Sequence, residues 1–150
     1  FVFPNLSLIE TGMTEELLDK KIANGLSKYL GLAFESICRD YLLYKSGRGE
    51  LPFRIMKLGK WWGNNQATKK EEEIDLLGLG DNQAIIGECK WTNARVGIGE
   101  LERLREKGSI IACKDRIFVI FSKSGFTTDL QELAVKDESV YLVTLDDLFA

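Results

Sequence analysis

A continuous apolar run limits the folds open to this chain more than any other feature. The run RIFVIF, from Arg116 to Phe121, lacks the polar alternation of a half-exposed strand and is bounded by polar residues. Such a run is typical of a strand buried on both faces, which requires other elements to pack above and below it. A further strand pattern, from Val140 to Thr144, follows a helical segment that begins at Thr127 or Thr128. Together these segments predict a sheet covered by helices.

The remaining segments complete an α/β outline. Apolar residues recur at helical spacing over 14–29, after the N-cap candidate Thr14, and again over 31–45, with Gly31 as the expected break. Extended residues follow Pro52 as far as Gly63, a polar loop comes next, and one more helix is expected at about 97–112. The expected order is α-α-β-β-β-α-β-α-β, which is a single domain over residues 1–150 with a mixed central sheet flanked by helices.

Two strand-like runs in the middle of the chain predict a β-hairpin. Residues 73–80 and 83–91 are joined at Asp81-Asn82, and both turn residues tolerate positive φ. Side chains alternate between the faces of a strand, so each face of the hairpin carries its own apolar set. One face is expected to carry Ile74, Leu76, Ile85, Cys89 and Trp91, and the other Leu77, Leu79, Ala84 and Ile86.

Four charged side chains are expected on one face at the open end of this hairpin. The register places Asp75 opposite Glu88, with Cβ atoms about 4.5–5.5 Å apart, and Glu73 opposite Lys90. Opposed like charges in an apolar setting are unfavourable unless something compensates them. A divalent cation between Asp75 and Glu88 would do so, and Mg²⁺ suits two carboxylates with water completing its shell. Lys90 would then hold an attacking water or a phosphoryl oxygen. The alternative is that Asp75, Glu88 and Lys90 form a surface ion-pair cluster.

A third carboxylate comes from the helical segment 31–45. At 100° per residue, Glu35 falls beside Cys38 and Leu42, on the rim of the buried stripe, from which it can reach a site at the sheet edge. The alternative is a local i,i+4 ion pair with Arg39.

Composition and charge narrow the chemistry further. The chain has no histidine, which excludes histidine-based nucleophilic triads, histidine general bases and histidine-ligated zinc. The net charge is −3, but residues 45–70 hold seven basic residues against one acid, whereas residues 125–150 hold six acids and one lysine. This asymmetry permits a polyanion on one face only, although two solvated surfaces of opposite sign explain it equally well.

The cysteines and the hydropathy pattern indicate a cytoplasmic protein. Cys38, Cys89 and Cys113 are an odd number without a C-x-x-C pair, as expected for free thiols in a reducing compartment. No stretch approaches the roughly 18 consecutive apolar residues of a membrane span, so no membrane partner is expected. The chain lacks a starting methionine and a basic leader, which suggests a piece of a longer polypeptide.

The acids and the lysine together resemble the signature of the PD-(D/E)XK nucleases. Glu35 on a helix, Asp75 on a strand and Glu88-Cys89-Lys90 on the next strand match that pattern, with Ile74 in place of the name-giving proline. The resemblance implies a restriction-endonuclease-like fold and phosphodiester cleavage with Mg²⁺ or Mn²⁺. It implies that Asp75, Glu88 and the Cys89 carbonyl bind the metal, that Lys90 orients or activates the water, and that Glu35 supports the metal or binds a second ion.

A second resemblance covers nearly the whole chain. The stretches 1–5, 59–63, 73–75, 86–91 and 121–126 are similar to the C-terminal domain of prokaryotic, largely archaeal, P-loop ATPases, a domain catalogued without a function. The resemblance implies ATPase and winged-helix domains in the same polypeptide. ATP hydrolysis would lie there, because this sequence contains no G-x-x-x-x-G-K-[ST].

DNA is the expected partner of such a domain. Contacts to phosphates are expected from five basic residues, Lys57, Lys60, Lys69, Lys70 and Arg95. Trp61, Trp62 and Trp91 either stack on exposed bases or belong to the core. Two rival functions remain: a catalytically inactive, nuclease-derived module that binds DNA or a protein and regulates the ATPase, and a partner-binding domain that uses the acidic segment 125–150.

Overall fold

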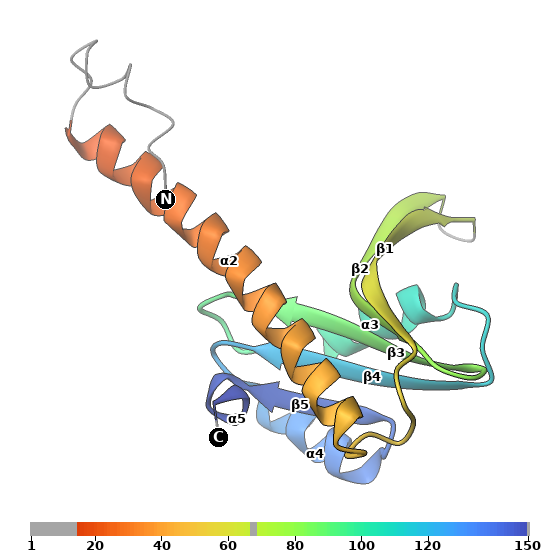
Figure 1. Cartoon of the computed structure of the whole chain (residues 1–150). Helices are drawn as coiled ribbons and strands as arrows, with labels where there is room; N and C mark the ends of the chain where they lie inside the picture. The colour runs from red at the N-terminus through yellow and green to blue at the C-terminus, as the bar shows by residue number, and fades with distance from the viewer. Residues whose placement is uncertain (1–14, 67–68, 150) are drawn as a thin grey trace.

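The computed structural model describes residues 15–66 and 69–149, with side chains from Lys20 onward. The N-cap candidate Thr14 and the N-terminal stretch 1–5 lie outside the described residues. The elements, in chain order, are α2 (Glu15–Gly47), β1 (Lys57–Asn65), β2 (Lys70–Leu79), β3 (Gln83–Lys90), α3 (Ile98–Gly108), β4 (Asp115–Ser122), α4 (Thr128–Lys136), β5 (Val140–Thr144) and α5 (Leu145–Leu148) (Figure 1).

The strands form one mixed five-stranded sheet in the order β1-β2-β3-β4-β5. The pairs β1–β2 and β2–β3 are antiparallel, whereas β3–β4 and β4–β5 are parallel and joined through α3 and α4. A parallel pair needs a long crossover, and the two helices supply it. The predicted α/β class, with a mixed sheet between helices, is confirmed.

Two apolar layers hold the helices to the sheet. The C-terminal half of α2 packs on one face through Phe34, Cys38 and Leu42. Helices α3 and α4 cover the other face, where Leu101, Leu104 and Leu130 are almost fully buried. The side chains of β4 alternate between the two layers, and residues 117–122 are all buried. The apolar run from Arg116 to Phe121 is therefore a strand covered on both faces, as its composition predicts.

The expected break at Gly31 is wrong, because α2 is one continuous helix of 33 residues. A glycine inside a helix costs only about 1 kcal/mol relative to alanine, which is too little to end a long helix at a single position. The apolar spacing also continues through Gly31 without a change of phase, so the helical register is kept. Over the described residues the observed order is therefore α-β-β-β-α-β-α-β-α. The part of α2 before Phe34 projects beyond the sheet, and Leu26 and Tyr29 are exposed there (Figure 1).

The β2–β3 hairpin has the predicted turn and register over its first four pairs, from Leu79↔Ala84 to Leu76↔Gly87. The Gly80 N–H donates to the Gln83 carbonyl at 2.9 Å, which closes the loop, and Asn82 has φ +56. The ladder stops at Leu76, however, so the expected pairs of Asp75 with Glu88 and of Glu73 with Lys90 do not form.

A β-bulge in β2 explains why the ladder stops. In the β1–β2 pairing, Leu77 lies opposite Gly59 and Ile74 opposite Trp61, so Asp75 and Leu76 together oppose the single residue Lys60. Two residues against one bend the bulged strand and reverse the alternation beyond it. Ile74 therefore packs under α3 and α4 with Leu77, rather than on the α2 face with Leu76 as predicted.

Beyond the bulge, β1 and β2 continue as a two-stranded ribbon that curves away from the sheet on the same side as the free part of α2 (Figure 1). We refer to residues 60–65 and 70–75 as the ribbon. Asn64 and Asn65 belong to β1, so the predicted polar loop begins two residues too early. Among the described residues, no helix is long and apolar enough to cross a membrane.

Candidate active site

The C-terminal half of β3 carries the two residues that define the candidate site. Alternation along β3 places Glu88 and Lys90 on the face that α3 covers, whereas Cys89 points to the α2 face. The Glu88 side chain is 14% exposed and the Lys90 side chain 28% exposed. Their Oε1 and Nζ atoms are 3.4 Å apart. A carboxylate and an amine are therefore held together at the margin of the core.

Asp75 joins these residues through the bulge rather than through a strand pair. Its Oδ2 accepts a hydrogen bond of 3.0 Å from the backbone N–H of Cys89, the residue between Glu88 and Lys90. This bond fixes the Asp75 carboxylate at the point where β2 leaves β3. This bond holds Asp75 at the backbone between Glu88 and Lys90, in place of the cross-strand pair that the sequence predicts.

The two carboxylates interact electrostatically. Burial, followed by the negative charge of Asp75, raises the pKa of Glu88 above its usual range, and this outweighs the opposing effects of Lys107 and Lys90. The ammonium of Lys90 has a raised pKa: burial lowers it, but Glu88 and Glu100 together more than compensate. Lys90 is therefore a cation at neutral pH, suited to holding an anion or a water rather than to removing a proton unaided.

Helix α3 contributes two residues that the sequence reasoning missed. Lys107 Nζ lies 3.3 Å from Glu88 Oε2, and Glu100 Oε2 lies 3.2 Å from Lys90 Nζ. Glu100 also pairs with Arg103, one turn further along the helix. The helical spacing of Glu100 and Lys107 along α3 gives a weak signal, since residues seven apart lie on one face, but only the packing of α3 against β3 identifies their partners.

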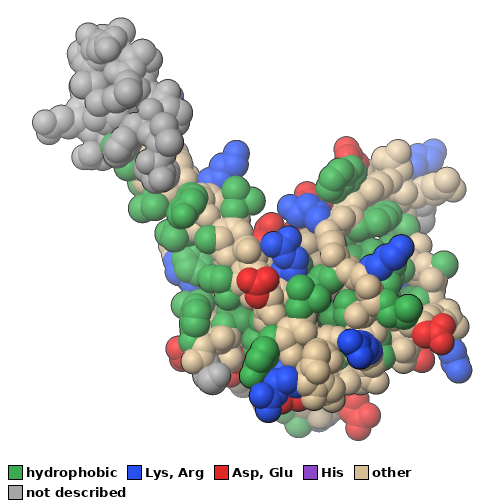
Figure 2. Space-filling view, viewed as in Figure 1, with side chains coloured by type: hydrophobic (Ala, Val, Ile, Leu, Met, Phe, Trp, Pro, Cys, Tyr) green, Lys and Arg blue, Asp and Glu red, His purple; other side chains and the backbone are tan. Residues whose placement is uncertain are grey.

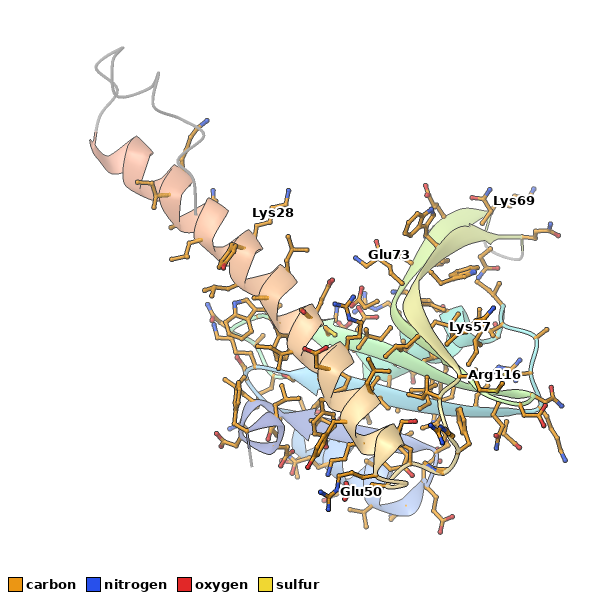
Figure 3. The ribbon with its side chains drawn as sticks, in the orientation of Figure 1. Lys28, Glu50, Lys57, Lys69, Glu73 and Arg116 are labelled. Carbon is orange, nitrogen blue, oxygen red and sulfur yellow. The ribbon has the colours of Figure 1, made fainter. Side chains whose placement is uncertain are left out.

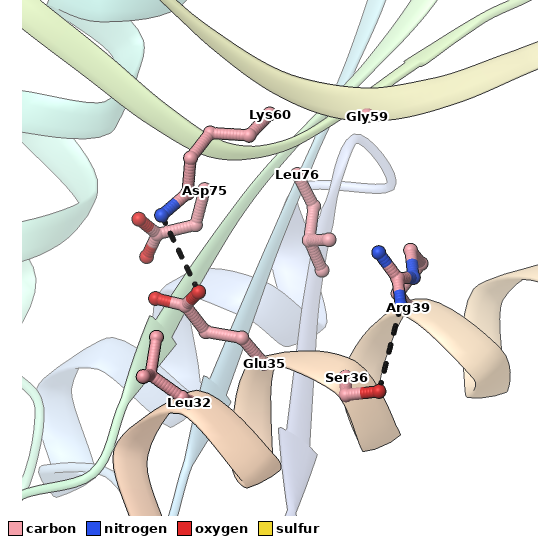
Figure 4. Close-up of a pocket in the computed structure, with 8 residues that line it drawn as sticks. All are labelled: Leu32, Glu35, Ser36, Arg39, Gly59, Lys60, Asp75 and Leu76. Atoms are coloured by element: carbon pink, nitrogen blue, oxygen red, sulfur yellow. Dashed lines mark hydrogen bonds and ion pairs between the residues drawn. The ribbon is translucent and has the colours of Figure 1, made fainter. Parts of the chain in front are cut away.

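Glu35 is placed near Asp75, as the helical rotation predicts, on the other side of the bulge. Glu35 lines a hollow of about 170 Å³ between α2 and the β1–β2 strands, together with Asp75 and Lys60 (Figure 4). Lys60 Nζ lies 3.4 Å from Glu35 and 2.9 Å from Glu73, so it links α2 to the ribbon. The alternative of a Glu35–Arg39 pair is wrong, because Arg39 instead donates to Ser36.

Glu73 is therefore not part of the group of four charged side chains that the sequence predicts on one face of the hairpin. The bulge turns it toward α2 and Lys60, so it does not lie opposite Lys90 (Figure 3). The hydrogen bond to Glu73 is the main reason that the pKa of Lys60 is raised.

The donors present fit a divalent cation only in part. Asp75 and Glu88 offer two neighbouring carboxylates, the number that Mg²⁺ commonly takes from a protein. Within residues 15–66 and 69–149, however, no group of three or more Cys, Asp and Glu side chains has the spacing of a metal site. Water would have to supply the remaining ligands, with the backbone carbonyl of Cys89 as the further protein donor that the family pattern implies.

The Cys89 thiol is not such a donor. It packs against the buried Cys38, and that contact, together with burial, raises the pKa of the Cys89 thiol well above its usual range. All three cysteines are free, as expected. Cys38 and Cys89 pack in the layer on the α2 face, whereas Cys113 packs against the layer that α3 and α4 cover.

The predicted DNA contacts are dispersed rather than gathered in one patch. Lys57 and Lys69 are exposed at opposite ends of β1 and β2, Lys70 and Arg95 are also exposed, and Lys60 is held by two glutamates (Figure 3). Figure 2 shows basic and acidic side chains interspersed along the open side between α2 and the ribbon.

Two of the three tryptophans pack against the core, and the third is exposed and could stack on a base. Trp61 is partly buried against the core, and Trp91 packs on Phe34 with ring centroids 5.1 Å apart. Trp62 is 65% exposed on the ribbon, beside Glu71, Glu72 and Glu73. Trp62 is thus the tryptophan available for stacking.

The acidic segment 125–150 is largely engaged in its own secondary structure. Asp129 accepts from Thr127 at the start of α4, Asp137 accepts from Ser139, and Asp147 forms a capping box with Thr144. These contacts account for three of its six acids. These acids therefore stabilise local structure, which counts against the hypothesis that segment 125–150 is a partner-binding surface.

Comparisons with known proteins place the chain in a family. Uncharacterized protein MJECL04 of Methanocaldococcus jannaschii is 35% identical over 97 residues, which are 63% of this chain and 20% of that protein. The chain thus spans about a fifth of its relative's length.

Two solved structures show weak similarity. The protein of unknown function AF1548 has a TM-score of 0.45 at 16% identity, covering 75% of this chain and 64% of its own. The DNA modification-dependent restriction endonuclease AspBHI has a TM-score of 0.37 at 15% identity, covering 79% of this chain and 33% of its own.

Residues 1–104 match the profile of DUF234, described as "Archaea bacterial proteins of unknown function". Since that match covers more than half of the chain, the protein belongs to the DUF234 family.

Proposed function

We propose that this domain hydrolyses phosphodiester bonds in DNA with Mg²⁺ or Mn²⁺, as a nuclease-like part of a longer protein. One observation carries the proposal: Asp75 is hydrogen-bonded to the backbone of Cys89, which brings it beside Glu88 and Lys90 at the junction of β2 and β3. Two carboxylates and one amine at a single point are a combination suited to metal-assisted hydrolysis. Burial first, and then repulsion from Asp75, raise the pKa of Glu88, and a cation would relieve that repulsion.

Each residue has a role in this proposal. Asp75, Glu88 and the carbonyl of Cys89 would hold the cation, which supplies Lewis-acid activation of a phosphoryl oxygen and of water. Lys90 stays protonated and orients the attacking water or the phosphate. Glu35 lies across the bulge and acts through water, once Lys60 has released it.

DNA would approach the edge at which β2 leaves β3, because Asp75, Glu88 and Lys90 belong to that junction. The exposed residues Lys57, Lys69, Lys70 and Arg95 would contact phosphates, and Trp62 would stack on an unpaired base. The acids interspersed with basic side chains between α2 and the ribbon repel phosphates, so we expect weak binding by the isolated domain. The contacts of the basic residues with phosphates make that binding sensitive to salt. The ATPase and winged-helix domains implied by the family resemblance would then supply most of the affinity.

The second candidate is a catalytically inactive module that binds DNA or a protein and regulates the ATPase. A specific observation favours it: both oxygens of Glu88 are already paired with lysines, and no third carboxylate joins Asp75 and Glu88 among the described residues. A site balanced by its own amines needs no metal for stability.

A cleavage panel separates the two candidates. The full-length polypeptide is incubated with duplex, branched and single-stranded DNA, with Mg²⁺ or Mn²⁺ and with EDTA. We expect metal-dependent cleavage of at least one substrate, abolished by Asp75→Asn and by Lys90→Ala. Glu102→Gln, which removes an exposed acid on α3, is the matched control and should cleave normally. Cleavage that persists in Asp75→Asn would exclude this site, and its absence from every wild-type reaction would favour the inactive module.

Metal binding can be measured without catalysis. Trp91 follows Lys90 in the chain and packs on Phe34, so its fluorescence should report a cation at the site. We expect a saturable change with Mn²⁺ in the wild type that is lost in Asp75→Ala. A flat titration at millimolar Mn²⁺ in the wild type would count against the metal site.

A further inference from the structure

Lys107 is positioned where it would oppose a cation at the candidate site. Its ammonium approaches Glu88 Oε2 at 3.3 Å, while Lys90 approaches Glu88 Oε1 at 3.4 Å. Each oxygen of this carboxylate therefore faces its own ammonium, and the Glu88 side chain is only 14% exposed. A divalent cation between Asp75 and Glu88 would meet both ammonium groups at short range, where like charges repel strongly because solvent screening is weak.

The two lysines differ in how firmly they are held. Lys90 is bound on two sides, by Glu88 and by Glu100. The ion pairs of the described residues give Lys107 a single carboxylate partner, Glu88. Lys107 is also in the last turn of α3, on a long side chain that can turn outward without leaving the favourable C-terminal end of the helix dipole. Of the two ammonium groups, that of Lys107 is the one able to leave.

We propose that Lys107 is an internal counter-ion of Glu88, which excludes the divalent cation from the free protein and moves to a DNA phosphate when substrate binds. This inference rests on the proposed function and adds a regulation to it. Metal and DNA then bind cooperatively, because the phosphate draws the ammonium away and opens Glu88 to the cation. Linkage requires that each ligand strengthen the binding of the other by the same factor.

The first test measures Mn²⁺ binding to the full chain without DNA, by the electron paramagnetic resonance signal of the free ion. Lys107→Met should bind Mn²⁺ about tenfold more tightly than the wild type, a typical size for coupling between sites. Lys107→Arg keeps the charge and should bind like the wild type. Lys136→Met removes a lysine from the last turn of another helix, α4, and should also leave the affinity unchanged. Equal affinity in Lys107→Met and the wild type would overturn the inference.

The second test has a decisive outcome in the wild type alone, so it stands even if a variant fails to fold. The affinity of the wild type for a short fluorescent duplex is measured by anisotropy, with Mn²⁺ and with EDTA, at constant ionic strength. We expect Mn²⁺ to tighten DNA binding by the same order, about tenfold, and Lys107→Met to show little such enhancement. DNA binding that is indifferent to Mn²⁺ in the wild type would overturn the inference.

The two proposals fail in distinguishable ways. Tighter Mn²⁺ binding in Lys107→Met, without cleavage of any DNA by the wild type, would remove the nuclease function and keep the counter-ion. Metal-dependent cleavage by the wild type, with Mn²⁺ affinity unchanged in Lys107→Met, would keep the function and remove the counter-ion.

Discussion

The sheet of this protein has two parts that are held by different forces. Strands β3, β4 and β5 lie between α2 on one face and α3 and α4 on the other, and β4 is buried over six consecutive residues. In the ribbon, Trp62 is 65% exposed, and the link to α2 is the Glu35–Lys60–Glu73 contact. Apolar burial stabilises the first part. The ribbon contributes Ile74 and Trp61 to the core at its base, and beyond them it depends on strand pairing and on ion pairs that water and salt weaken.

The candidate site lies on the boundary between these parts. Glu88 and Lys90 belong to the packed strands, while Asp75 is the residue at which the ribbon departs. A bulge at this position aims one carboxylate at a fixed partner, which a regular ladder would not do. The packed strands therefore fix the positions of Lys90 and Glu88, whereas the start of the ribbon sets the position of Asp75. Four measurements test this contrast.

The largest expected effect comes from truncating the packed half. Ile120→Ala removes a fully buried side chain of β4 and should lower the free energy of unfolding by about 3–4 kcal/mol. Trp62→Ala removes a larger side chain from the ribbon and should cost less than about 1 kcal/mol, because little apolar area leaves the core. Urea unfolding of both variants checks the difference. Losses of equal size would show that the ribbon is packed as firmly as the strands.

Two glycines give a smaller contrast of the same kind. A Cβ at Gly108 would lie 2.8 Å from Phe118 Cε1 and 3.3 Å from Ile86 Cγ1, whereas one at Gly59 meets nothing within 4 Å. Gly108→Ala should therefore lower the free energy of unfolding by about 1–2 kcal/mol, because overpacking exceeds the helical gain. Gly59→Ala should change it by less than about 0.5 kcal/mol. Thermal unfolding compares the two, and a loss in Gly59→Ala would contradict the open surroundings of β1.

A pH-dependent contribution is expected where β5 begins. Hydrogen bonds from Ser139, together with Arg105, hold the pKa of Asp137 below its usual value of 3.8. A carboxyl with a lowered pKa stabilises the fold above that usual value and loses this contribution as the pH falls through the lower folded pKa.

Asp137→Asn should therefore lower the free energy of unfolding at neutral pH by about 1 kcal/mol, a value moderated by partial exposure. The difference from the wild type should shrink in acid, below pH 3.8. Urea unfolding at several pH values measures it. A difference that is constant with pH would mean that the Asp137 carboxylate charge plays no part.

The smallest effect belongs to the ion pair that ties the ribbon to α2. Glu73 is 53% exposed, so Glu73→Gln should lower the free energy of unfolding by less than about 0.5 kcal/mol at low salt. At about 1 M salt the difference should vanish, since the screening length is then about 3 Å. Denaturation at both salt concentrations checks it. A large, salt-independent loss would place Glu73 among the residues that hold the fold.

The match between prediction and structure depends on the range of the interaction. The turn at Asp81-Asn82 and the register from Leu79 to Leu76 are confirmed, because a two-residue loop sets both. The position of Glu35 on the rim of the buried stripe of α2 follows from helical rotation, and the packing of α2 on the sheet then brings it to the hollow that Asp75 also lines. The expected break at Gly31 is wrong, because one glycine costs a helix only about 1 kcal/mol and the apolar spacing continues on both sides of it.

The bulge at Asp75 escaped prediction for a similar reason. It exists because β2 must pair with β1 and β3 at once, and no local pattern in Glu73–Leu76 encodes two ladders that disagree in register. The ion pairs of Lys107 and Glu100 were not predicted, because their partners are 19 and 10 residues away in the chain and belong to a different element. Contacts of this kind become visible only once α3 is packed on the sheet.

The sequence by itself determined the strands, the crossover helices and the chemical character of the site, because hydrophobic periodicity and turn residues act over a few neighbours. It also determined that carboxylates and amines carry any chemistry, since histidine is absent. Only the tertiary structure decided which acids meet which amines. These contacts join residues of β2, β3 and α3. Each charged side chain pairs with whichever group the packing of the apolar core brings within reach.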